Sequence, residues 1–182
     1  MIMRSRHWLA GIGISMLALM PAMALAQQDR SARPSPPGIA ELITKHNKIT
    51  IEYGRPSVRG RKIMGELVPF GEVWRTGANE ATSFSTDADI TIGGTNIPAG
   101  KYTLYTLLSA AGWKLIVNKQ TGQWGTIYDQ TQDLARIDMK KSETKAPVEQ
   151  FTISFKTTRP GSADLVLEWE NTRVSVAVKA RN

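Results

Sequence analysis

The chain has 182 residues, no cysteine and two histidines, with 23 Lys and Arg against 16 Asp and Glu. The lack of cysteine excludes disulfides, thiol nucleophiles and thiolate metal sites. The formal net charge of +7 is a moderate excess that favours solubility and association with phosphate- or carboxylate-bearing envelope surfaces.

The first 26 residues have the three parts of a secretory signal. Arg4, Arg6 and His7 form a basic start, an apolar run follows over residues 8–20, and Ala24-Leu25-Ala26 forms a small-x-small cleavage site. The apolar run is too short to span a bilayer comfortably. We therefore expect cleavage after Ala26 and an exported chain, periplasmic or extracellular, with no stable membrane insertion.

Removal of this segment leaves one histidine, His46, which we expect at the surface in a turn. A Ser-His-Asp triad or a multi-histidine metal site would have to use it. We expect no metal and no cofactor. Export and the absence of a recognition motif argue against a nucleic-acid partner, and the sequence leaves the oligomeric state open.

Residues 27–38, "QQDRSARPSPPG", contain three prolines and almost no apolar side chains, so we expect a flexible leader. Residues 39–182 then form one domain. Helical spacing is confined to a short run at Ile39, Leu42, Ile43 and His46, for which a strand is preferred, turning at His46-Asn47.

The rest of the chain has the period-two alternation typical of strands with one buried face. The apolar positions are Ile49, Ile51 and Tyr53; Ala88, Ile90 and Ile92; Tyr102, Leu104 and Leu108; Trp113, Leu115 and Val117; Ala135, Ile137 and Met139; Phe151, Ile153 and Phe155; Leu165, Leu167 and Trp169; and Val174, Val176 and Val178. Hairpins are expected at Gly93-Gly94, around 109–112 and at 170–172. About eight to ten short strands without a convincing helix predict an all-β antiparallel sandwich or jelly-roll-like barrel.

Three polar loops are candidates for a binding site. The first, "YGRPSVRGRK", carries Tyr53, Arg55, Arg59 and Arg61. Arginine's planar donors match carboxylates and phosphates, so the loop either holds an anion or is a solvated basic loop after an edge strand.

The second loop is "GEVWRTGANEATSF", residues 71–84. Gly77 and Asn79 tolerate left-handed backbone, which permits a compact turn. Arg75, Asn79 and Glu80 there either hold a ligand or hold the fold, with Arg75 and Glu80 forming an ion pair in the second case. Trp74 is interpreted as core filler or as a stacking platform.

The third loop, "NKQTGQWGTIYDQ", holds Trp124, Tyr128 and Asp129. Its aromatic residues suit either a stacking platform or a loop anchored by its own side chains. The weak catalytic candidates are Glu80 and Asp129, with Glu72 and Asp133 as further carboxylates. Two carboxylates across one cleft would permit glycosidic bond cleavage, although nothing in the spacing makes any two of them face each other.

The segment from Ile51 to Leu107 and the later run "WKLIVNKQTGQWG" resemble the exported bacterial family catalogued as domain of unknown function 2911. The run "VWRTGANEAT" is its most specific part, and the resemblance covers roughly residues 39–155. It implies a secreted or periplasmic globular domain and carries over no catalytic residue.

From the three loops we predict a domain that binds a small anionic or carbohydrate-like ligand without converting it. The predicted ligand-binding residues are Tyr53, Arg55, Arg59, Arg61, Arg75, Asn79, Glu80, Trp124 and Tyr128. One alternative is a hydrolase using Glu80 or Asp129 as acid or base. The other is a non-catalytic envelope interaction module whose polar turns close the fold.

Overall fold

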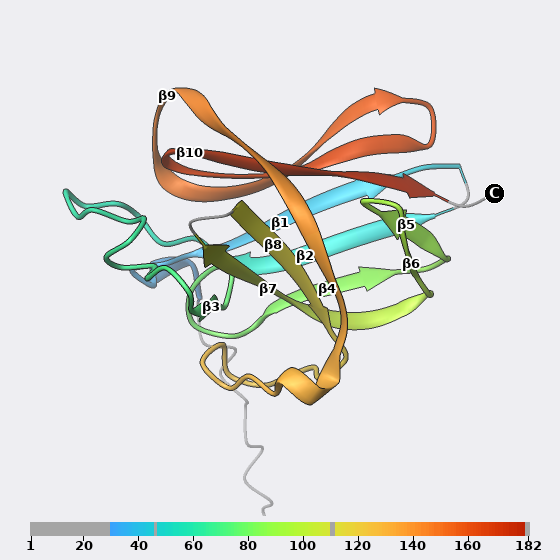
Figure 1. Ribbon diagram of the computed structural model, residues 1–182, viewed down its shortest axis with the longest axis horizontal. Helices are drawn as coiled ribbons and strands as arrows, with labels where there is room; N and C mark the ends of the chain where they lie inside the picture. Colours follow the sequence, from blue (N-terminus) through green and yellow to red (C-terminus); the bar gives the residue numbers. More distant parts are fainter. Residues whose placement is uncertain (1–29, 46, 110–111, 181–182) are drawn as a thin grey trace, which may run out of the picture.

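The computed structural model describes residues 30–45, 47–109 and 112–180 (Figure 1). The described residues form ten strands and two 3-10 turns and contain no α-helix, so the all-β prediction is confirmed. The elements are η1 (Arg30–Ala32), β1 (Pro37–Ile43), β2 (Lys48–Gly54), β3 (Val73–Trp74), β4 (Thr82–Thr86), β5 (Ile90–Ile92), β6 (Thr95–Ile97), β7 (Gly100–Ser109), β8 (Gly112–Asn118), η2 (Gln130–Gln132), β9 (Asp133–Arg159) and β10 (Ser162–Ala180). No helix in this part of the chain has the length and apolar character of a membrane span.

All ten strands belong to one antiparallel sheet. Its order is β1-β2-β4-β7-β8-β9-β10-β5-β6, and β3 pairs with β7 off this path. The sheet is not closed, but it folds back on itself, because the long β9 and β10 cross above β1 and β2 (Figure 1). The result is the sandwich-like alternative rather than a closed barrel.

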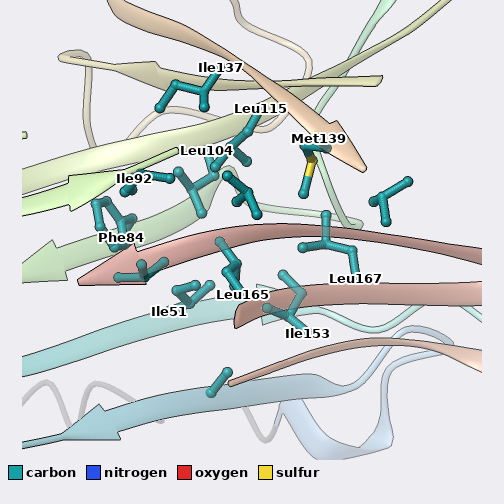
Figure 2. Packing of buried hydrophobic residues seen from close by; sticks show 14 of the residues in the cluster. Ile51, Phe84, Ile92, Leu104, Leu115, Ile137, Met139, Ile153, Leu165 and Leu167 are labelled. Carbon is teal, nitrogen blue, oxygen red and sulfur yellow. The ribbon is translucent and has the colours of Figure 1, made fainter. Parts of the chain in front are cut away.

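The core lies between the two layers of this folded sheet. The predicted alternation places Ile51, Leu104 and Leu115 on the inner face of one layer, where each side chain is fully buried. Ile153 and Leu165 face them from β9 and β10 (Figure 2). Burying such side chains stabilises the fold by about 1.5–3 kcal/mol each. Because a slip of one residue would expose them, their burial determines the register of the strands.

The predicted turn at Gly93-Gly94 is confirmed, since it joins β5 to β6 with φ angles of 56° and 87°. The predicted hairpin at 170–172 is wrong. Strand β10 continues through these residues as a bulge, with Glu170 at a φ of 54°, and pairs with β9 on both sides of it. The reversal lies instead at Gly161, whose φ of 72° suits a residue without a Cβ.

Two side chains join β2 to the facing edge of β9. The Tyr53 hydroxyl accepts a hydrogen bond from Ile153 N at 2.8 Å and donates to Ile153 O at 3.3 Å. Arg55 Nε donates to Phe151 O at 3.2 Å, and its Nη2 donates to Thr152 Oγ1 at 3.0 Å. These bonds satisfy backbone groups at an edge where the sheet is open, a position at which unpaired groups are costly.

An aromatic cluster packs beside this junction. Trp74 stacks on Trp169 with ring centroids 5.6 Å apart and meets Phe151 edge-on at 5.0 Å. Tyr53 also contacts Phe151 edge-on, at 5.7 Å. Trp74 is therefore core filler, one of the two roles that the sequence left open.

Replacing Tyr53 with Phe should lower the free energy of unfolding by about 1–3 kcal/mol, because Ile153 N and O would stay buried without their partner. Urea denaturation measures the change. Tyr102→Phe is the matched control, since its hydroxyl makes a single bond to Pro98 O and its loss should cost less. Equal stability of Tyr53→Phe and the wild type would contradict the proposed junction.

Candidate functional site

A groove of about 730 Å³ lies on the outer face of β2, β4 and β7. A volume in this range suits a small-molecule ligand. The lining residues are Arg33, Ser35, Pro37, Gly38, Ile39, Thr50, Glu52, Tyr53, Gly54, Asn79, Glu80, Ala81, Ser83, Phe84, Ser85, Lys101, Tyr102, Thr103, Thr121, Gly122 and Gln123. The outward positions of β2, β4 and β7 in this groove carry polar side chains, in contrast to the apolar inner face of the same strands.

The floor follows from strand alternation. On each strand the residues between the core positions point outward, and pairing aligns them in two rows across the sheet. The rows are Glu52, Ser83 and Thr103, and Thr50, Ser85 and Lys101. The register that buries the inner face therefore also sets the positions of the groove side chains.

One wall comes from the segment before β1. Arg33 Nη1 donates to both oxygens of Glu80, at 2.8 and 3.0 Å. Asn79 Nδ2 donates to Ser35 O at 3.1 Å, and Asn79 itself adopts a φ of 66°. The predicted partner of Glu80 was Arg75, whereas in the structure Glu80 pairs with Arg33.

A second wall is the turn at 121–123. Gln123 Nε2 donates to Thr103 Oγ1 at 3.2 Å and to the Tyr105 hydroxyl at 3.0 Å. Gln123 O accepts from Ala81 N at 3.2 Å. These bonds fix the turn against β7 and the residue before β4.

Four side chains on the floor have hydrogen-bonding capacity to spare: Glu52, Ser83, Ser85 and Lys101. Within residues 30–45, 47–109 and 112–180, none of the four side chains makes a hydrogen bond or an ion pair. The neighbouring Thr50 and Thr103 differ, since their hydroxyls donate to Glu41 Oε1 and to Gln120 O.

The four residues of the first predicted loop do not gather at the groove. Tyr53 and Arg55 hold β9, and only Tyr53 of the four also lines the groove. Arg59 Nη2 donates to Pro34 O at 3.1 Å. Arg61 donates to Val58 O and Ser57 O within its own loop. Backbone carbonyls thus take up donors that the sequence assigned to an anion.

The second and third loops do meet. The backbones of Glu80 and Trp124 form a bridge, and the Arg75 side chain packs where a Cβ on Gly125 would lie. Trp124 is half-exposed, and Arg75 Nε is buried without a hydrogen-bond partner among the described residues. Of the nine predicted ligand-binding residues, Tyr53, Asn79 and Glu80 line the groove, whereas Arg75 and Trp124 lie beside it.

Tyr128 and Asp129 have local structural roles outside the groove lining. The Tyr128 hydroxyl donates to Asp133 Oδ2 at 2.7 Å and accepts from Arg136 Nη2 at 2.7 Å. Asp129 caps η2 by accepting bonds from the side chain and backbone of Thr131, which lower the pKa of its carboxyl. Burial first, and then the hydrogen bond to Asp133, raises the pKa of Tyr128 to about 12.

Catalytic candidates are placed as follows. Glu80 lines the groove together with Glu52, and both Glu80 oxygens accept from Arg33. Glu72 is exposed. His46 and the predicted signal peptide lie outside the described residues. Among the described residues, no group of three or more His, Asp or Glu side chains could hold a metal ion.

Five residues line the groove that were not predicted as binding residues from the sequence: Arg33, Glu52, Ser83, Ser85 and Lys101. In the sequence, the four of these residues that lie on strands are recognisable only as polar residues that alternate with apolar ones. Every strand with one buried face has this pattern, so it does not single them out. Only the pairing of β2, β4 and β7 brings them together.

A family model described as "Protein of unknown function (DUF2911)" matches residues 35–178. The match includes the C-terminal strand region that the sequence resemblance did not cover. No curated protein and no solved structure matches the chain.

We predict that Tyr128 ionises at about pH 12 rather than near its ordinary value of 10.0. A raised folded-state pKa favours the neutral phenol, so its contribution to stability should be intact below pH 10 and lost between pH 10 and 12. Alkaline absorbance titration of the wild type and of Tyr128→Phe measures this. If the phenol that disappears from the titration in Tyr128→Phe is one that ionises near pH 10 in the wild type, the prediction is contradicted.

Proposed function

Since the chain belongs to the DUF2911 family, whose description assigns no activity, we propose that it is an exported domain that binds a small polar ligand in the groove. The ligand is carbohydrate-like or anionic. The observation that carries the proposal is the set of four floor side chains with unused hydrogen-bonding capacity inside a groove of about 730 Å³.

The hydroxyls at the middle of the floor suit a ligand with many polar groups. Ser83 and Ser85 each offer a donor and an acceptor, and Glu52 and Lys101 extend this with a strong acceptor and a strong donor. Carbohydrate hydroxyls match such a mixed surface, because each of them also donates and accepts. The proposal replaces the arginine loop with the sheet face as the main binding surface.

The groove walls support a binding role in a second way. Arg33 and Gln123 are already held by Glu80 and by Thr103 with Tyr105. A ligand would therefore enter a groove whose sides are ordered in advance, which reduces the entropy lost on binding. Export is supported by the sequence of residues 1–26 alone.

We predict that one or more compounds from a panel of sugars, sugar phosphates and cell-wall fragments will raise the melting temperature. A ligand at 100 times its Kd stabilises by about 2.7 kcal/mol, which corresponds to roughly 5–11 °C for a domain of about 150 residues. Thermal-shift measurements test this. If no compound of the panel stabilises the protein, the proposed function is lost.

A matched pair of variants locates the site. Ser83→Phe places a bulky side chain on the groove floor, where β-structure tolerates it, and should abolish the ligand-induced shift. Ser142→Phe makes the same change at an exposed position on β9 outside the groove and should retain it. A shift that survives in Ser83→Phe would place the binding site elsewhere.

Expression of the full chain in a Gram-negative host should yield a periplasmic protein that begins at Gln27, as read by intact mass. Changing Ala24 and Ala26 to Gln should block this cleavage, because the site requires small residues. An uncleaved wild-type chain found in the cytoplasm would contradict export.

A further inference from the structure

From the charges on the groove floor, we infer that the ligand is a small zwitterion, with an ammonium group that Glu52 binds and an acidic group that Lys101 binds. This inference rests on the proposed binding function and names the class of ligand. It starts from a balance of charges in the groove.

Four charged side chains line the groove: Arg33, Glu52, Glu80 and Lys101. Arg33 and Glu80 neutralise each other, since the guanidinium donates to both carboxylate oxygens. Beyond the floor, Glu41 pairs with Lys48 at 2.7 Å and is likewise satisfied. The charges left for a ligand are one carboxylate, Glu52, and one ammonium, Lys101.

Glu52 and Lys101 do not satisfy each other. Within the described residues neither takes part in an ion pair. They lie on β2 and β7, with β4 between them and a two-residue offset along the strands. Strand spacing and rise place their Cα atoms roughly 12 Å apart. Two opposite charges are therefore presented on one floor at separate points.

Ser83 and Ser85 occupy β4, between the two charges. A ligand that spans the floor would meet a carboxylate at one end, hydroxyls in the middle and an ammonium at the other end. Its complement has an ammonium, a hydrogen-bonding middle and an acidic group, in that order. Charge complementarity of this kind selects a ligand by orientation as well as by composition.

Two sources share this chemistry: an amino sugar that bears a carboxylate, and a short peptide with free termini. An extended tripeptide has its termini about 10 Å apart, which is close to the Cα separation of Glu52 and Lys101. Both sources can be tested with sets of compounds that differ only in charge.

The sugar set consists of four β-1,4-linked disaccharides: glucosaminyl-glucuronic acid, glucosaminyl-glucose, glucosyl-glucuronic acid and glucosyl-glucose. The peptide set is trialanine, its N-acetyl form, its C-terminal amide and the form blocked at both ends. Isothermal titration of the protein should rank the zwitterion first in at least one set. Each missing charge should weaken binding roughly two- to tenfold, the range for partly exposed ion pairs and charged hydrogen bonds.

Two variants assign the charges to residues. Glu52→Gln should remove the advantage of compounds with an ammonium group, and Lys101→Met should remove the advantage of compounds with a carboxylate. Glu143→Gln and Lys179→Met make the same changes at exposed positions outside the groove lining and should leave the ranking unchanged. Higher ionic strength should narrow the differences within each set.

The outcomes separate the two levels of the proposal. If all members of a set bind the wild type equally and Ser83→Phe binds none of them, the groove stays the binding site and the inference of a zwitterionic ligand is overturned. A preference for the singly charged or neutral members would also overturn the inference of a zwitterionic ligand while keeping the groove as the binding site. If neither set binds and the wider panel also gives no stabilisation, the proposed function and this inference fall together.

Discussion

The fold depends on the hydrogen bonds that join β2 to the edge of β9. An open sheet leaves backbone groups without partners, and here Tyr53 and Arg55 supply those partners from their side chains. Because these bonds hold the end of β2 against β9, the position of Gly54 at that end is also set. Gly54 packs so closely on the backbone of Ala78 that a Cβ would collide with it. The turn carrying Asn79 and Glu80 is therefore positioned by the same junction.

The groove and the core are two faces of the same strands. Inward residues such as Ile51, Phe84 and Leu104 are buried and set the register through the large free energy of apolar burial. Outward residues such as Glu52 and Ser83 contribute little to folding, yet the same register holds them in place. A slip of one residue would exchange the two faces, so the positions of the groove side chains are as well defined as the core.

The sequence predicted most of the core and little of the site, for different physical reasons. Alternation reports burial locally, and it identified the inward positions of most strands. Arg55 and Arg59 donate to the carbonyls of Phe151 and Pro34, which are distant in the chain, and residue type cannot reveal such partners. Arg61 donates to carbonyls of its own loop. The bulge at Glu170 has the polar residues of a turn, and only its pairing with β9 distinguishes it from a hairpin. Groove residues are recognisable only once β2, β4 and β7 are aligned.

The wall formed by Arg33 and Ser35 is held by polar contacts alone. No residue from Ser31 to Ile39 is buried, whereas the strands on which the wall rests carry the core. Substitutions of Arg33 and Ser35 therefore change the groove at small thermodynamic cost to the sheet. Natural variation is therefore free to reshape this side of the groove while the sheet beneath it stays unchanged.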